Sequence, residues 1–259
     1  MLLLVDDLDF PARRARFCRI AEKTAATART QGDYGFGTLQ EKRLHAILKK
    51  YLCDDTDFHE VGVPGTRFLL DIRIGDEVCE VQTGNFAPLK QKLQYLLENT
   101  ACTVTVAHPL VARRSICWID PADGSVSPAR RVGGIEKPVH LLAKLYPLLS
   151  LLPNERLCFR ALLLEVCDFR LLSPGRLPKR HTRRYERIPT DLLGEEVFSS
   201  TADFRALLPA DLPARFPVSV FSKLTGLRGR DSYSAVRVLA KLGILRQIPD
   251  ARPMTFEKI

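Results

Sequence analysis

Two short stretches in the first third of the chain alternate between apolar and polar residues, as strands with one buried face do. They are residues 67–74 and 77–82. Gly75-Asp76 lies between them, and a two-residue sequence of this kind favours a tight turn. The pattern therefore predicts a β-hairpin.

The register of this hairpin places two carboxylates side by side. If the turn closes as expected, Ile74 faces Glu77, and counting back in steps of two sets Asp71 opposite Glu80. The Cβ atoms of such a pair lie about 5 Å apart. Like charges at this spacing repel, so a fold that keeps both needs a shared proton or a cation between them.

Helical and strand-like patterns surround the hairpin. Apolar residues recur at helical spacing before and after it, and Asn85 is a suitable N-cap for the helix that follows. A basic helix over residues 11–29 comes first, and a further strand is expected at 115–119. Between these two, the expected order is helix, three strands, helix and strand, at residues 38–52, 58–63, 67–74, 77–82, 85–98 and 102–107.

The second half of the chain predicts a helix over residues 137–152 and a long strand within 157–172. Near the end, a short helix at 218–224 precedes a second helix that Asp231 or Ser232 caps and that runs to Leu242. A hairpin within residues 243–256 follows. The layout of these last elements resembles a winged helix.

These patterns predict an α/β (α+β) protein with four regions. They are an N-terminal helix and loop (1–37), a core (38–172), a basic connector (173–200) and a winged-helix domain (201–259). A chain of 259 residues is long enough for one full domain and a smaller one.

Charge favours a polyanionic partner. The formal net charge is +9; residues 1–150 carry 20 Lys/Arg against 18 Asp/Glu, and residues 151–259 carry 19 against 12. The basic second half is therefore expected to hold phosphates. No apolar run is long enough for a membrane helix or suits a signal peptide, so we expect a cytoplasmic protein with no membrane partner. The seven cysteines, an odd number, are expected to be reduced core residues.

The hairpin and its flanking helices resemble the core of the PD-(D/E)xK, or restriction-endonuclease-like, nucleases. Asp71 matches the first acid of that motif and Glu80 the second, and Gln82 stands where the motif has lysine. In addition, residues 37–45 with 80–86 look like a prokaryotic family that joins this αβββαβ core to a C-terminal winged helix.

The resemblance implies a Mg²⁺ or Mn²⁺ site on Asp71 and Glu80 that acts on a phosphodiester. Gln82 departs from the motif, because an amide can orient water but carries no positive charge. Some families move the lysine to the following helix, and Lys92 is the candidate for that role. The alternative for Lys92 is a side chain that extends to solvent from the edge of its helix.

Glu41 is a candidate third metal ligand, because many members of the group add an acid from the helix before the sheet. It also fits a capping box with Thr38, in which the glutamate binds the N-cap amide and needs no metal. The two uses do not exclude each other.

Two basic segments are candidates for DNA binding. Residues 176–187 either hold phosphates or form a solvated linker. The second helix of the expected winged helix either enters a groove of DNA or docks another protein. The residues expected to contact DNA are Lys179, Arg180, Arg183, Arg184, Arg230, Tyr233, Arg237 and Lys241.

These observations favour a metal-dependent DNA endonuclease. One alternative is a nuclease-fold protein that binds DNA or regulates without cutting, and another is a protein-docking component of a defence or repair system. Because nucleases of this group often pair to cut both strands, a homodimer is also expected.

Overall fold

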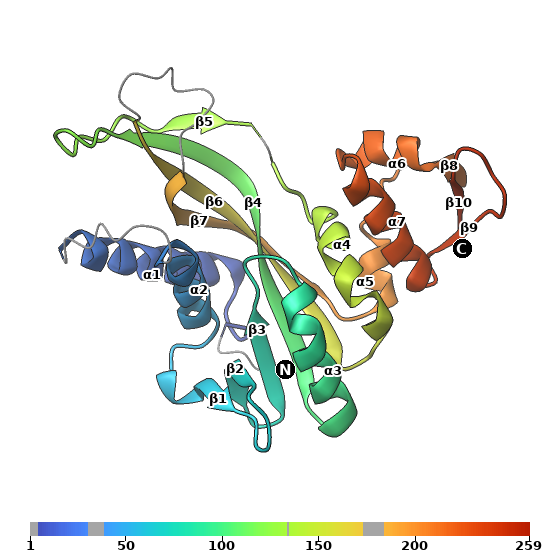
Figure 1. Ribbon diagram of the computed structural model, residues 1–259, viewed down its shortest axis with the longest axis horizontal. Helices are drawn as coiled ribbons and strands as arrows, with labels where there is room; N and C mark the ends of the chain where they lie inside the picture. The colour runs from blue at the N-terminus through green and yellow to red at the C-terminus, as the bar shows by residue number, and fades with distance from the viewer. Residues whose placement is uncertain (1–4, 31–38, 134, 173–183) are drawn as a thin grey trace. The chain divides into compact units, whose positions relative to one another are not determined.

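The computed structural model describes residues 5–30, 39–133, 135–172 and 184–259 (Figure 1). It shows a mixed α+β fold with a large mixed sheet, a smaller sheet and several helices, which confirms the general fold class. The helices before and after the hairpin give the expected order of helix, three strands, helix and strand. These elements are α2 (Leu39–Leu52), β1 (His59–Gly62), β2 (Leu69–Ile74), β3 (Glu77–Val81), α3 (Lys90–Asn99) and β4 (Thr103–Ile119).

The large sheet has seven strands. Its hydrogen-bonded order is β1-β2-β3-β4-β6-β7, and β5 pairs with β4 beside this path. Strands β2 and β3 are antiparallel, whereas β3 and β4 are parallel. The strands outside the expected core are β5 (Arg130–Val132), β6 (Leu157–Leu171) and β7 (Arg184–Phe198).

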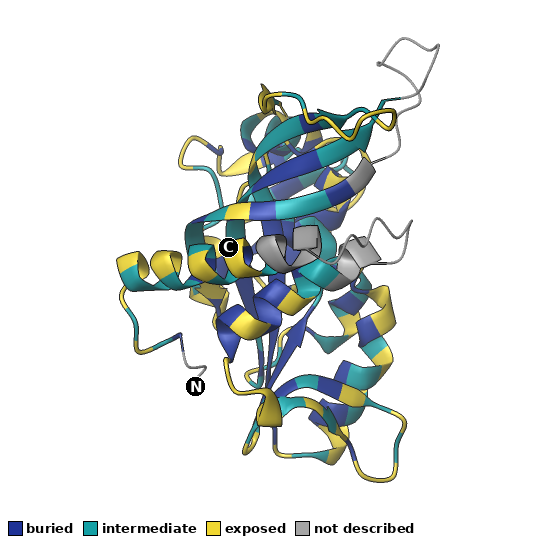
Figure 2. Cartoon of the chain, turned by 90° about the vertical axis from the view of Figure 1, so that its left-hand side faces the viewer, coloured by how far each residue is buried: buried dark blue, intermediate teal, exposed yellow. Residues whose placement is uncertain are grey.

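The chain forms two compact units. The first comprises Met1–Val61, Val111–Glu136 and Leu162–Glu195, and the second comprises Gly62–Leu110, Lys137–Ala161 and Glu196–Ile259. Strands β4, β6 and β7 each contribute residues to both units. Figure 2 shows that the central strands are largely buried, while exposed residues gather on helices and turns.

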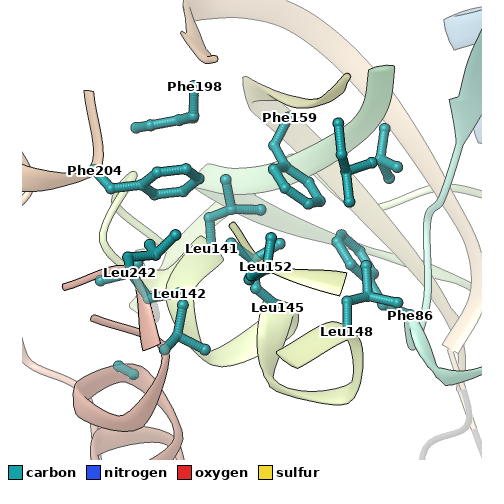
Figure 3. Close-up of a cluster of buried hydrophobic side chains, with 14 of the residues drawn as sticks. Phe86, Leu141, Leu142, Leu145, Leu148, Leu152, Phe159, Phe198, Phe204 and Leu242 are labelled. Atoms are coloured by element: carbon teal, nitrogen blue, oxygen red, sulfur yellow. The ribbon is translucent and has the colours of Figure 1, made fainter. Parts of the chain in front are cut away.

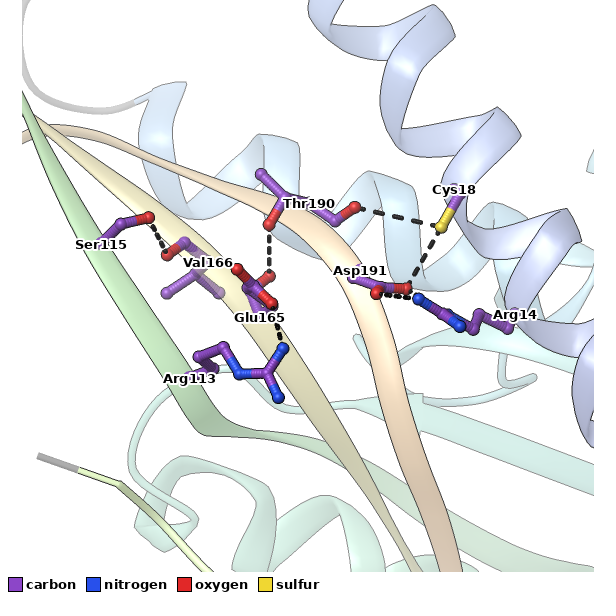
Figure 4. Close-up of polar contacts among 8 residues, drawn as sticks. All are labelled: Arg14, Cys18, Arg113, Ser115, Glu165, Val166, Thr190 and Asp191. Atoms are coloured by element: carbon purple, nitrogen blue, oxygen red, sulfur yellow. Dashed lines mark hydrogen bonds and ion pairs between the residues drawn. The ribbon is translucent and has the colours of Figure 1, made fainter. Parts of the chain in front are cut away.

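In the first unit, ion pairs fasten helix α1 (Phe10–Thr30) to strand β7. Arg14 binds both carboxylate oxygens of Asp191 at 2.8 and 2.6 Å, and Cys18 lies 3.4 Å from the same carboxylate (Figure 4). Arg13 binds buried Glu195, which also accepts a hydrogen bond from the Tyr51 hydroxyl of α2. Polar contacts therefore secure this helix alongside the apolar packing of its buried residues.

In the second unit, a continuous apolar core joins the sheet to the helices. Helix α4 (His140–Leu145) and the 3-10 helix η3 (Tyr146–Leu151) supply Leu141, Leu145 and Leu148, which pack among aromatic rings (Figure 3). Phe198 stacks on Phe204 of α5 (Thr201–Arg205), with ring centroids 5.2 Å apart. The core thus extends from β7 into the C-terminal elements.

The C-terminal elements form two helices and a small antiparallel sheet of order β8-β10-β9. Gly226, whose φ of 80° suits glycine, caps the C-terminus of helix α6, and Gly229 is the N-cap of α7. Helix α7 therefore begins at Arg230, one or two residues before the caps we expected. The elements are β8 (Arg215–Pro217), α6 (Val218–Thr225), α7 (Arg230–Lys241), β9 (Leu245–Gln247) and β10 (Thr255–Lys258).

Two local expectations were wrong. The strands expected at residues 102–107 and 115–119 are one 17-residue strand, β4. Pro109 does not end this strand, because it lies between the residues that pair with β3 and those that pair with β5. Part of the expected connector, Arg184–Phe198, is strand β7. Its polar sequence is explained by acids that pair with arginines on helices α1 and α2.

In the part of the chain that the structure describes, no helix combines the length and the apolar character needed to cross a membrane. The short 3-10 helices η1 (Thr56–Phe58) and η2 (Ala87–Leu89) complete the elements.

Candidate active site

The β2–β3 hairpin has the register expected from the sequence. Ile74 pairs with Glu77 and Ile72 with Cys79, and the same register continued by one residue sets Asp71 opposite Glu80. Gly75 begins the turn with a φ of 60°, a conformation that glycine adopts without strain. The hairpin therefore brings two carboxylates to one face of the sheet.

The two carboxylates lie in different surroundings. Asp71 is half-buried, and its Oδ2 accepts a hydrogen bond of 2.8 Å from the amide of Val81. Glu80 is only 1% exposed, and its Oε2 lies 2.7 Å from Nζ of Lys92. The other oxygen of Glu80, Oε1, is buried and has no hydrogen-bond partner among the described residues. A buried carboxylate oxygen without a partner is costly, which indicates a site prepared for a cation or a proton.

Helix α3 supplies the positive charge of the site. Lys92 extends toward the sheet, where Nζ binds Glu80 and also donates a 2.7 Å hydrogen bond to the carbonyl of Leu69. Its side chain is 18% exposed. These contacts exclude the alternative in which Lys92 extends into solvent. The lysine comes from the helix, ten residues after the motif position held by Gln82.

Burial raises the pKa of Glu80 to about 7. The Lys92 ammonium opposes this rise, and the nearby Asp71 carboxylate adds to it. Loss of hydration disfavours the charged form more than one ion pair can offset. Glu80 therefore titrates near neutral pH.

Gln82 does not contact the carboxylates in any described interaction. Its side-chain Nε2 donates a hydrogen bond of 2.5 Å to the carbonyl of Asn85, and its backbone carbonyl lies 2.5 Å from Nδ1 of His108. The Gln82 amide thus supports the loop after β3. The Asn85 side chain accepts a hydrogen bond from the amide of Ala87, but the N-cap of η2 is Phe86 and that of α3 is Leu89, so the expectation that Asn85 caps α3 was wrong.

His108 was not a site candidate in the sequence analysis. It is buried, and its ring meets Phe86 edge-on at 5.0 Å. Only the parallel pairing of β3 with β4, which puts Val81 beside Ala107, brings this histidine next to Gln82. Its spacing along the chain carries no such signal.

The donor set fits a magnesium ion that keeps water and substrate among its ligands. Among the described residues, no three His, Cys, Asp or Glu side chains gather into a metal-binding group. Mg²⁺, however, is commonly held by one or two carboxylates together with waters and substrate phosphate. Asp71 and the unpartnered oxygen of Glu80 meet that need. The backbone of Glu41 belongs to α2, but its side chain lies outside the described residues.

The expected DNA-contacting residues fall into two groups. Lys179, Arg180, Arg183 and the side chain of Arg184 lie outside the described residues. On α7, by contrast, four exposed side chains follow each other at intervals of three and four residues, which places them along one face of the helix. They are Arg230, Tyr233, Arg237 and Lys241.

One arginine of the basic segment already has a structural partner. Arg187 binds both oxygens of Asp168, at 2.7 and 3.0 Å, and Asp168 is buried. A buried, bidentate pair of this kind secures strand β7 to β6, which leaves Arg187 unsuited to hold a phosphate.

The mixed sheet with paired carboxylates on a hairpin defines the class of protein only as an α+β protein with a candidate cation site. Residues 42–199 match the model of the family described as Domain of unknown function (DUF8091), so the chain belongs to that family. No curated protein and no solved structure shows significant similarity to the chain. The matched region contains Asp71, Glu80 and Lys92 and ends before α5.

Proposed function

We propose that the protein is a metal-dependent phosphodiesterase that cuts DNA. The observation that carries the proposal is the buried, unpartnered Oε1 of Glu80 beside Asp71, with Lys92 on the other oxygen. Carboxylates of this arrangement are what the PD-(D/E)xK resemblance implies. The order of helices and strands around them agrees with that resemblance.

Each side chain has a distinct role in this proposal. Asp71 and Glu80 would hold Mg²⁺ or Mn²⁺, which when bound polarises the phosphate and lowers the pKa of the attacking water. The hydrogen bond from Val81 fixes the orientation of Asp71. Lys92 keeps Glu80 in place and provides a positive charge next to the phosphate, the role that Gln82 cannot fill.

The C-terminal elements would hold the substrate. Two helices with a small three-stranded sheet are the elements that a winged helix would contain, and α7 exposes Arg230, Tyr233, Arg237 and Lys241 along one face. Three of the four are cationic and the fourth is aromatic, a set suited to the DNA backbone and groove.

The test is cleavage of labelled duplex, flap and single-stranded DNA with Mg²⁺ or Mn²⁺. We expect Asp71→Asn and Glu80→Gln each to reduce the cleavage rate at least about a hundredfold, the scale of losing a group that stabilises the transition state. Asp76→Asn is the matched control, because Asp76 is an exposed acid at the turn of the same hairpin. Cleavage that survives both active-site substitutions would disprove the proposed site.

A second candidate function is DNA binding without cleavage. The position of Gln82 favours it, because the motif lysine is absent and the amide is engaged with Asn85. This alternative predicts metal-independent DNA binding and no cleavage with either metal. The same assay, paired with a binding measurement, decides between the two.

A further inference from the structure

A second cationic surface lies in the first unit, on strand β5 and the end of β4 that pairs with it. Arg114 pairs with Val132 and Ile116 with Arg130 in an antiparallel ladder. Among the described strands, β5 pairs with β4 alone, so its other side is a free sheet edge there (Figure 1). We call this surface the β5 edge; its arginines are Arg113, Arg114, Arg130 and Arg131.

The register distributes these arginines over both faces of the β5 edge. Residues opposite each other in an antiparallel pair share a face, and successive residues alternate. Arg114 and Arg130 therefore share one face, and Arg113 and Arg131 share the other. Each face thus displays two guanidinium groups.

The two arginines of β5 have no ion-pair partner in the part of the chain that the structure describes. Arg130 and Arg131 are exposed, and neither makes an ion pair or side-chain hydrogen bond with any described residue. Asp33 and Glu41 are the only acidic side chains that the structure does not describe. Arg113 is 46% exposed although it pairs with Glu165, and Arg114 donates to the carbonyl of Gly133.

Acidic residues near the β5 edge are few and occupied. Residues 113–119 and 125–135 contain no Asp or Glu. Asp120 and Asp123, in the turn between them, accept backbone hydrogen bonds from Ala122 and Ser125. Because Glu165 pairs with Arg113, the uncompensated positive charge of these strands comes from Arg114, Arg130 and Arg131.

We propose that the β5 edge binds the phosphate backbone of duplex DNA. Guanidinium groups recognise phosphate by paired hydrogen bonds, and several on one surface give an affinity that falls steeply with salt. The inference rests on the proposed function only in taking DNA as the ligand; it needs neither metal nor cleavage. A different explanation is that charge on an edge strand prevents aggregation by strand pairing.

Trp118 provides a local reporter for this surface. It is the sole tryptophan and is half-buried, four residues after Arg114 on β4, so it shares the face of Arg114 and Arg130. DNA bound at the β5 edge is expected to change its fluorescence.

The experiment measures binding of a labelled DNA duplex to the full chain carrying Asp71→Asn, in EDTA, over a series of salt concentrations. Adding Arg130→Gln and Arg131→Gln should weaken binding roughly tenfold or more at low salt. It should also lower the slope of log K against log salt by about 1.8, the loss of two phosphate contacts. The matched control is Arg19→Gln with Lys50→Gln, which removes two exposed charges from helices α1 and α2 of the same unit.

The outcomes separate this inference from the proposed function. The inference would be overturned if the β5 variant kept the salt dependence of DNA affinity unchanged, or if the control variant lost as much affinity. It would also be overturned if DNA binding left Trp118 fluorescence unaltered. A variant that aggregates but binds DNA normally would overturn it too, as would a preference of the β5 edge for single-stranded DNA or RNA over duplex. If the β5 substitutions abolish duplex binding and the wild-type protein cleaves no DNA, the β5 edge is supported as a DNA-binding surface. The proposed nuclease activity is then disproved.

Discussion

Glu80 combines burial with a single ion-pair partner, and this couples the stability of the protein to pH. Its pKa in the folded protein is about 7, above the ordinary 4.5. Between these values the folded chain binds more protons than the unfolded chain, so stability falls as pH rises through this window. Most of the loss is complete slightly above pH 7.

We expect Glu80→Gln to remove most of this pH dependence. Without divalent ions, ionisation of Glu80 should lower the free energy of unfolding of the wild type by about 3 kcal/mol between pH 4 and pH 8. The neutral amide of Gln does not ionise, so the variant should not show this loss. Urea unfolding at both pH values measures the difference. Equal pH dependence in the two proteins would show that Glu80 does not titrate in this range.

Metal binding should depend on the same proton. A cation competes with the proton for Glu80, so the apparent Mg²⁺ affinity should fall by up to about tenfold per pH unit below pH 7. The rise in Tm on adding Mg²⁺ should therefore be larger at pH 8 than at pH 6. In Glu80→Gln this rise should be small at both. A rise in Tm that is independent of pH in the wild type would contradict this expectation.

Lys92 should contribute to stability chiefly at alkaline pH. Lys92→Met would leave the charged Glu80 buried without its ion pair, at a cost of about 3 kcal/mol at pH 8. At pH 5, where Glu80 is already protonated, the cost should be much smaller. Thermal unfolding at the two pH values tests this, with Lys90→Met as a control on the same helix. A loss that is equal at both pH values would mean that Lys92 acts through packing alone.

At the scale of elements, helix α1 depends on a buried acid. Arg13 and the Tyr51 hydroxyl both donate hydrogen bonds to the Glu195 carboxylate. Arg13 also donates to the backbone carbonyls of Leu8 and Asp6. Arg13→Met would remove a charged partner of the Glu195 side chain, which is 2% exposed, and is expected to cost about 3 kcal/mol. Arg19→Met, on an exposed position of α1, should cost almost nothing. Denaturant unfolding of both variants measures the difference.

The apolar core of the second unit is expected to be sensitive to cavities. Leu145 is completely buried between the sheet and the C-terminal helices, so Leu145→Ala should cost about 3 kcal/mol. Leu69→Ala is the control, because Leu69 is 58% exposed. A comparable loss in both variants would show that Leu145 is not a core residue.

The hairpin was predictable from the sequence because its turn, alternation and register are local. Asp71 beside Glu80 follows from counting residues back from Gly75. The helix boundaries that lie near glycines could be predicted from the sequence almost as well. Contacts set by distant pairing were not: His108 reaches Gln82 only through the parallel β3–β4 ladder.

Strand β7 shows a second limit of sequence patterns. Its many charged residues suggested an exposed connector, because charged side chains are usually solvated. In the structure, Glu186, Asp191 and Glu195 instead pair with arginines on α1 and α2. The partner of a buried charge lies far away in the sequence, and no local pattern reveals it.

At the scale of the whole molecule, the oligomeric state remains a prediction. A nuclease that cuts both strands of a duplex commonly uses two active sites, and we expect a homodimer on that ground. Sedimentation of the protein with and without duplex DNA measures it. A monomer under both conditions that nonetheless makes double-strand breaks would contradict the expected dimer.

The stack of Phe198 on Phe204 bears on which fragment of this chain can fold when it is expressed separately. The family match ends at residue 199, between these two rings, and α7, which packs against α4, lies beyond it. A recombinant fragment cut at that boundary would expose Leu141, Leu142 and Leu145 to water. We expect such a fragment to be recovered from cells as an insoluble aggregate, whereas one that retains the C-terminal helices stays in solution.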